Sequence, residues 1–255
     1  MCAESLKYLQ PGRVVSKMYL TFIISEFKKW LREPLTRIII FYPLLFGAIG
    51  RYLLPYVEEN TAFMIAPYAD IITASLVLMM PMIFGALIAF SILDDRDDDV
   101  LDAVAVTPLG LTKFFSFRLI MIYLCSFLAC LFVILFADIV QLKLTAIVHL
   151  SALASLSAPM TGLFINAFAK NKIEGFAVMK GFGALIFFPI IALFFTDFKE
   201  LFFALAPGFF PAKMLSTLIR IEETMFLSYS TYVLAGWSYG FLLNILSYRV
   251  FQKRK

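Results

Sequence analysis

Long apolar segments alternate with short charged connections along the chain. Each segment holds about 20 residues, the length that an α-helix needs to cross a hydrocarbon core roughly 30 Å thick. The segments lack the alternation of barrel strands, and open β-structure cannot cross lipid with unpaired backbone groups. We therefore predict six transmembrane helices, over residues 38–57, 71–93, 119–137, 144–169, 175–196 and 224–248.

Two further elements are predicted outside these spans. In residues 17–33, apolar side chains recur about one helical turn apart, at Met18, Phe22, Ile23, Phe27 and Trp30. This pattern, with cations elsewhere on the wheel, favours an amphipathic helix in the cytoplasmic membrane interface, and a soluble helix is the alternative. Residues 197–223 are too apolar for a solvated loop and contain prolines. They predict short re-entrant helices at the external interface.

Composition and charge agree with an all-α polytopic membrane protein that forms a single domain, residues 1–255. Hydrophobic residues make up 62% of the chain, against roughly half in a soluble domain. Cytoplasmic loops carry an excess of Lys and Arg. Most of the 22 such residues lie on the side of the two termini, and the exceptions are Arg51, Lys143, Lys199, Lys213 and Arg220. We expect a bacterial cytoplasmic (inner) membrane with both termini cytoplasmic, and we expect no nucleic-acid partner.

The most polar stretch, residues 94–102, holds six aspartates and follows the second predicted span. A calcium loop needs glycine at its sixth position and glutamate at its twelfth. Counted from Asp95, these positions hold Val100 and Val106, so we predict no metal site. Acidic residues suit a helix N-terminus, and Pro108 ends the segment. The stretch favours a short amphipathic helix over residues 94–107, and a solvated acidic loop is the alternative.

Residues 95–109, DRDDDVLDAVAVTPL, resemble the segment that follows the second span in type-2 ATP-binding-cassette exporter permeases. That segment carries a charged triplet, a Leu-Glu pair and Thr-Pro-Leu, and a basic residue opens the third span. The matching positions are Asp95, Arg96, Asp97, Leu101, Asp102, Thr107, Pro108, Leu109 and Arg118. The chain departs from the pattern at Asp99, Val100, Gly110 and Phe117.

The resemblance implies a coupling helix that docks on a separate cytoplasmic ATPase and transmits its closure to the spans. Complementary charge and an apolar face suit such docking. The expected ATPase-coupling residues are Asp95, Arg96, Asp98, Leu101, Asp102, Thr107, Pro108 and Lys172. The implied partners are two ATPase copies, a second copy of this or a homologous permease, and membrane lipid.

No phosphate-binding loop of the form Gly-x-x-x-x-Gly-Lys-Ser/Thr occurs in the chain. We therefore expect no enzymatic activity of the chain by itself and no bound cofactor, with ATP and Mg on the partner subunit. The resemblance also implies a substrate path between two permease copies. Its candidate lining residues are Met79, Met80, Phe84, Phe187 and Phe188. Methionine and aromatic surfaces suit hydrophobic or amphiphilic cargo, although core or lipid-facing packing is the alternative.

The predicted function is an ATP-driven exporter permease for such a compound, with a drug or antibiotic favoured over a lipid or lipid-linked glycan. Three alternatives remain. An intramembrane hydrolase could use Ser238 of GWSYG with His149, but the nucleophile elbow needs a strand-to-helix turn. An ion-coupled secondary transporter or channel needs a buried ion relay, whereas Asp70 and Asp138 lie at span ends. A mechanotransmitter subunit that moves no solute fits the same sequence.

Overall fold

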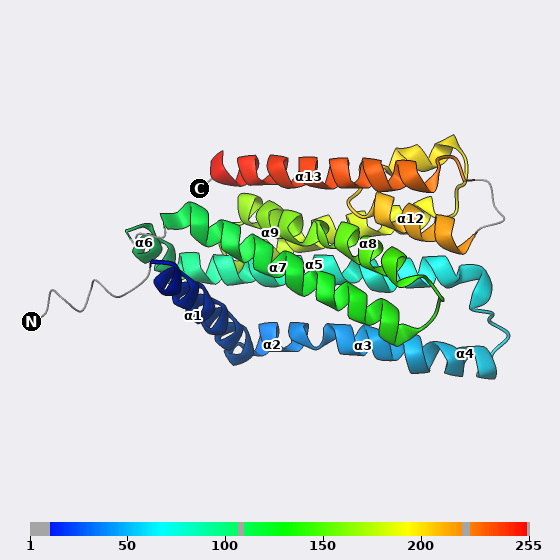
Figure 1. The fold of residues 1–255 in the computed structure, drawn as a ribbon, viewed down its shortest axis with the longest axis horizontal. Coiled ribbons are helices and arrows are strands. Elements are labelled where there is room, and N and C mark those ends of the chain that lie inside the picture. Colours follow the sequence, from blue (N-terminus) through cyan, green and yellow to red (C-terminus); the bar gives the residue numbers. More distant parts are fainter. Residues whose placement is uncertain (1–10, 107–109, 221–224, 254–255) are drawn as a thin grey trace, which may run out of the picture. The chain divides into compact units, whose positions relative to one another are not determined.

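The computed structural model describes residues 11–106, 110–220 and 225–253, which are almost entirely helical (Figure 1). The chain divides into two units, of which the first is residues 1–41. This unit contains α1 (Pro11–Arg32) and α2 (Pro34–Ile40). Pro34 cannot continue the helical hydrogen bonds, so it ends α1 and starts α2. Helix α1 covers residues 17–32 of the predicted 17–33 and begins earlier, and its interfacial position stays a prediction.

The second unit, residues 42–255, is a bundle of helices joined by short connections. Its first half contains α3 (Tyr42–Ala48), a π-helical turn (Ile49–Leu53), α4 (Leu54–Asn60), η3 (Ala66–Tyr68), α5 (Ala69–Asp97), α6 (Val100–Ala105) and α7 (Gly110–Ala137). Its second half contains α8 (Leu144–Ser155), α9 (Ser157–Phe168), α10 (Lys172–Gly183), η4 (Ala184–Ile186), α11 (Phe187–Ala192), η5 (Phe198–Phe203), α12 (Phe209–Ile219) and α13 (Tyr229–Lys253).

Helix α5 forms the centre of this unit. It packs against α7, α9, α10 and α12, and against shorter stretches of α3, α6 and α8. From Phe84 to Asp95 its residues are all buried, because neighbours cover every side of the helix. A helix that is apolar all round suits such a central position.

Among the described residues, four helical segments are long and apolar enough to cross a membrane: Ala66–Asp97, Gly110–Ala137, Leu144–Phe168 and Lys172–Ala192. They correspond to the second to fifth predicted spans and support a multi-pass helical membrane protein. The first predicted span is divided by the π-helical turn, and α13 is continuous but more polar. The count of six spans therefore stays a prediction.

Three spanning segments contain a proline, which removes one helical hydrogen bond. Two of these segments are interrupted near the proline, and the third remains a continuous helix. Pro159 cannot donate to the carbonyl of Ser155, and the chain breaks there between α8 and α9. The turn η4 similarly lies just before Pro189. Helix α5 is continuous through Pro81, although this proline leaves the carbonyl of Val77 without its usual donor.

The freed Val77 carbonyl has a partner on a neighbouring helix. The Cys130 thiol of α7 donates to it at 3.6 Å, and the Ser155 hydroxyl lies 3.7 Å from the same sulfur. Cys130 is fully buried. This contact joins α5, α7 and α8 at the proline, where an unpaired carbonyl in lipid would cost several kcal/mol.

Small residues bring α5 and α9 close together. In the fourth predicted span, small residues recur at three- and four-residue spacing, which predicts a face for close helix packing. This face is buried along its length, at Ser151, Ala154, Ser155, Ala158 and Gly162. On the facing side, a Cβ atom at Gly85 would lie 2.6 Å from the carbonyl oxygen of Ala158. A Cβ atom at Gly162 would lie 2.5 Å from Ile88 Cγ2. The predicted packing role of this face is confirmed.

Substitution of Gly85 tests this close approach. We expect Gly85→Ala to lower the free energy of unfolding by about 1–3 kcal/mol, because the opposing atom belongs to backbone that cannot rotate away. Gly181→Ala is the matched control, since a Cβ atom there meets nothing within 4 Å. Thermal unfolding of the purified chain in detergent compares the two variants. Equal melting temperatures would contradict the packing of α5 on α9.

Candidate functional site

The acidic stretch is divided between the end of α5 and the separate helix α6. Helix α5 continues to Asp97, and α6 begins at Val100. Between them Asp99 has a left-handed backbone with φ of 55°, a conformation that aspartate tolerates better than most residues. The structure therefore corrects the single helix predicted over residues 94–107. Thr107 and Pro108, two predicted coupling residues, lie outside the described residues.

Asp95 points into the bundle and forms an ion pair with Arg118 of α7. The side chains are 7% and 1% exposed, respectively. The Arg118 guanidinium also lies over the Phe114 ring, 4.4 Å from its centre. Asp95 was predicted as an ATPase-coupling residue. Its buried position leaves it unexposed for direct contact with an ATPase, and its part in coupling stays a prediction. Asp95 and Arg118 are the first and the last of the positions that match the family segment, and the ion pair brings them together.

Two further contacts fasten the end of α5 to the next pair of helices. Lys172, at the start of α10, pairs with Asp94 at 2.6 Å. Arg96 donates to the carbonyl of Ala169, just after α9, at 3.0 Å. Asn171 caps α10 by accepting from the backbone of Glu174 at 3.0 Å. Arg96 and Lys172, both predicted coupling residues, thus make contacts within this chain.

The remaining acidic side chains face outward. Asp97, Asp98, Asp99 and Asp102 are exposed, whereas Leu101 is 9% exposed. Helix α6 contacts both α5 and α7, so its buried leucine lies on the side toward the bundle. Of the predicted coupling residues, Asp98 and Asp102 are therefore accessible, and Leu101 anchors the helix. We call Asp97, Asp98, Asp99 and Asp102 the acidic surface.

The candidate substrate-path residues divide between interior and surface. Met80 and Phe84 are 0% and 6% exposed, packed within the α5 core. They therefore do not line an open surface of this chain, which corrects the prediction for these two. Met79, Phe187 and Phe188 are 37%, 64% and 43% exposed. These three stay candidates for a surface shared with cargo, lipid or another subunit.

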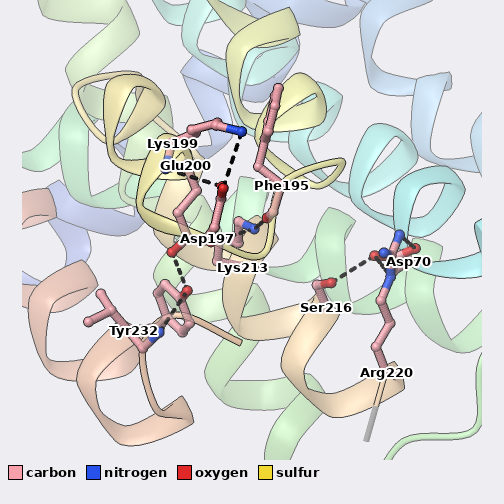
Figure 2. A network of polar contacts seen from close by, with 10 residues as sticks. Asp70, Phe195, Asp197, Lys199, Glu200, Lys213, Ser216, Arg220 and Tyr232 are labelled. Atoms are coloured by element: carbon pink, nitrogen blue, oxygen red, sulfur yellow. Dashed lines mark hydrogen bonds and ion pairs between the residues drawn. The ribbon is translucent and has the colours of Figure 1, made fainter. Parts of the chain in front are cut away.

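A second polar network lies in the segment between α11 and α13, at residues that sequence reasoning treated as loop charges (Figure 2). Glu200 of η5 pairs with Lys213 of α12 at 2.7 Å, and both side chains are 0% exposed. Tyr232 of α13 donates to Glu200, and Lys213 donates to the carbonyl of Phe195. This buried cluster joins η5, α12 and the chain at Phe195 to α13. The sequence did hold a signal for this cluster, since Glu200 and Lys213 lie in a very apolar segment. Charges that become buried there need partners.

The same segment is also fastened to the start of α5. Asp70 accepts from Ser216 of α12 at 2.8 Å and pairs with Arg220 at 2.9 Å (Figure 2). Asp70 is 1% exposed. Residues 197–223 thus contain short helices, as predicted: η5, which packs against α11, and α12, which packs on α5 and α13. Their depth in a membrane stays a prediction.

Loss of one partner tests the buried pair. We expect Lys213→Met to destabilise the chain by about 3–5 kcal/mol, because Glu200 would keep a buried, uncompensated charge. Adding Glu200→Gln should recover part of that loss. Lys199→Met is the control, since the Lys199–Asp197 pair is exposed and such pairs contribute at most about 1 kcal/mol. Thermal unfolding in detergent is the measurement. A control as unstable as Lys213→Met would show that the buried pair is not special.

A family model and two related proteins assign the chain to the same family. The family model described as "Fluoroquinolones export permease protein Rv2686c-like" matches residues 26–248. The chain is 30% identical over 202 residues to the fluoroquinolones export permease protein Rv2686c of Mycobacterium tuberculosis strain ATCC 25618 / H37Rv. The same identity holds for the protein MT2760 of strain CDC 1551 / Oshkosh. Both alignments cover 74% of this chain and 78% of the relative. No solved structure matches the chain.

Proposed function

The chain belongs to the family of Rv2686c-like fluoroquinolones export permeases, and from this we propose that it is the membrane subunit of an ATP-driven drug exporter. The cargo is an amphiphilic compound that leaves the cytoplasm or the inner leaflet. Fluoroquinolones, which the relatives' names state, are the first candidates. ATP hydrolysis belongs to a separate cytoplasmic subunit, present in two copies with two permease chains.

The observation that carries the coupling proposal is the two-sided construction of α6. Its buried Leu101 holds it on α5 and α7, while Asp102 on its outer side and Asp98, just before the helix, are accessible. Complementary charge fixes the register of a docked partner, and a basic ATPase surface suits this acidic one. An anionic cytoplasmic leaflet repels the same surface, so the helix projects toward soluble protein instead of lipid.

The ion pairs behind α6 supply a route for its movement. Asp95–Arg118 connects the end of α5 with α7, and Asp94–Lys172 connects it with α10. A displacement of α6 by the ATPase therefore reaches three spanning segments through short, charged contacts. Asp95 and Arg118 act here as positioning residues and do not touch the ATPase.

Charge reversal on the acidic surface tests docking. We expect Asp98→Lys and Asp102→Lys each to reduce co-purification of the cytoplasmic ATPase about tenfold, because like charges oppose each other across the contact. Glu59→Lys is the matched control, as Glu59 is an exposed residue of α4 outside the acidic surface. Fluoroquinolone efflux should fall in parallel. Unchanged ATPase binding in both variants would remove α6 from the contact.

The Asp95–Arg118 pair is tested by separating binding from transport. We expect Asp95→Asn to retain ATPase co-purification but to reduce drug efflux about fivefold or more, a typical coupling effect. The reciprocal exchange, Asp95→Arg with Arg118→Asp, should restore part of the efflux. Immunoblots of the membrane fraction verify equal amounts of each variant.

The energy source is tested separately in the wild-type protein. If efflux stops with a protonophore while ATP is maintained, an ion-coupled transporter replaces this proposal.

A further inference from the structure

A long groove lies between α7, the α8–α9 segment and α13. Its volume is about 740 Å³. The walls are mainly apolar, with Ile120 from α7, Pro159 and Leu163 from α9, and Trp237 and Phe241 from α13. Ile120 and Phe241 are 61% and 54% exposed. The groove belongs to neither the acidic surface nor the network around Glu200.

The length of the groove corresponds to one leaflet. Along α13 it extends from Trp237 to Arg249 and Gln252. At 1.5 Å per helical residue, the distance from Trp237 to Arg249 is about 18 Å. Half of a hydrocarbon core is roughly 15 Å. A single acyl chain that enters at one membrane face could therefore follow the whole groove.

Two polar side chains deep in the groove, Tyr123 and Asn244, are already hydrogen-bonded within the protein. Tyr123 donates to the carbonyl of Ala152 at 3.3 Å. Asn244 donates to the carbonyls of Leu156 and Gly240, both at 2.9 Å. These bonds turn the side-chain donors toward the break between α8 and α9. The deep part of the groove consequently offers an apolar wall to an occupant.

The opposite end of the groove carries free polar groups. Ser116, Arg249 and Gln252 line it there, and within the described residues their side chains form no hydrogen bond or ion pair. Arg249 is exposed. The Phe115 and Phe251 rings meet edge to face at 5.1 Å, which sets this end beside the start of α7, the helix that α6 contacts. It is therefore the end that the charge distribution predicts to be cytoplasmic.

We propose that this groove binds one anionic phospholipid of the cytoplasmic leaflet. The phosphate lies at Arg249 and Gln252, and an acyl chain follows the apolar wall toward Trp237. Basic pockets between transmembrane helices on the cytoplasmic side are suited to anionic head groups. The site depends on the predicted orientation of the chain and is independent of the proposed ATPase coupling.

Lipid titration of the full-length chain tests the charge at the mouth. Delipidated protein in detergent is titrated with phosphatidylglycerol or phosphatidylcholine, and bound lipid is counted by native mass spectrometry. We expect wild type to prefer phosphatidylglycerol. Arg249→Gln should weaken phosphatidylglycerol binding about fivefold, the effect of one cation near an anionic head group, and should leave phosphatidylcholine unchanged. Lys113→Gln is the control, because Lys113 is an exposed α7 cation outside the groove lining.

A second pair of variants tests the apolar wall. Ile120→Trp fills the groove and should reduce binding of both lipids, whereas Leu128→Trp should not. Leu128 is 63% exposed on the same helix but does not line the groove. Three results would overturn the proposal: no lipid preference in wild type, equal loss with Lys113→Gln, or unchanged lipid binding in Ile120→Trp. A change in the monomer–dimer ratio without a change in bound lipid would assign the groove to a second copy of the chain.

Discussion

The buried charge of Arg118 determines how the end of the bundle that carries α6 is arranged. A guanidinium that is 1% exposed needs a carboxylate nearby, because an unpaired buried charge is strongly destabilising. Asp95 supplies that carboxylate from the last turns of α5. Because the helix cannot rotate without breaking the pair, the direction of the following residues is also fixed. Asp98 then faces outward, and Leu101, buried on the side of α6 toward α5 and α7, keeps Asp102 outward as well.

Helix α5 is fixed by charge at both of its ends. Asp70 in its first turn pairs with Arg220, and Asp94 and Asp95 near its last turn pair with Lys172 and Arg118. Its 29 residues correspond to about 44 Å of helix, close to the full thickness of a bilayer with its head groups. The paired carboxylates therefore occur at the depths where polar groups are tolerated, while the apolar middle packs against α7 and α9.

Sequence alone predicted the parts of this fold that depend on composition and period. The apolar runs gave the spanning helices, and the buried face from Ser151 to Gly162 followed from the spacing of small residues. The division of the aspartates could not be predicted in the same way. Neighbouring residues such as Asp95 and Asp98 have the same chemistry, and only the position of Arg118 decides which one is buried.

The network around Glu200 was missed for a related reason. Counting Lys213 and Arg220 toward topology treats each as a solvated loop cation, but both have carboxylate partners that are distant in sequence. Met80 and Phe84 show the opposite limitation. A methionine-rich run looks the same whether it lines a path or fills a core, and here the neighbours of α5 decide that these two fill the core.

The thiol that pairs with the Val77 carbonyl gives α5 a particular mechanical character. In an uninterrupted helix, resistance to bending comes from bonds within the helix itself. Next to Pro81 one of these bonds is replaced by a contact to Cys130 on α7. Thiols are weak donors, so this contact yields at a smaller load than an amide bond. The middle of α5 can therefore bend more easily than its ends. Its resistance to bending there depends on whether α7 moves together with it and keeps the Cys130 contact.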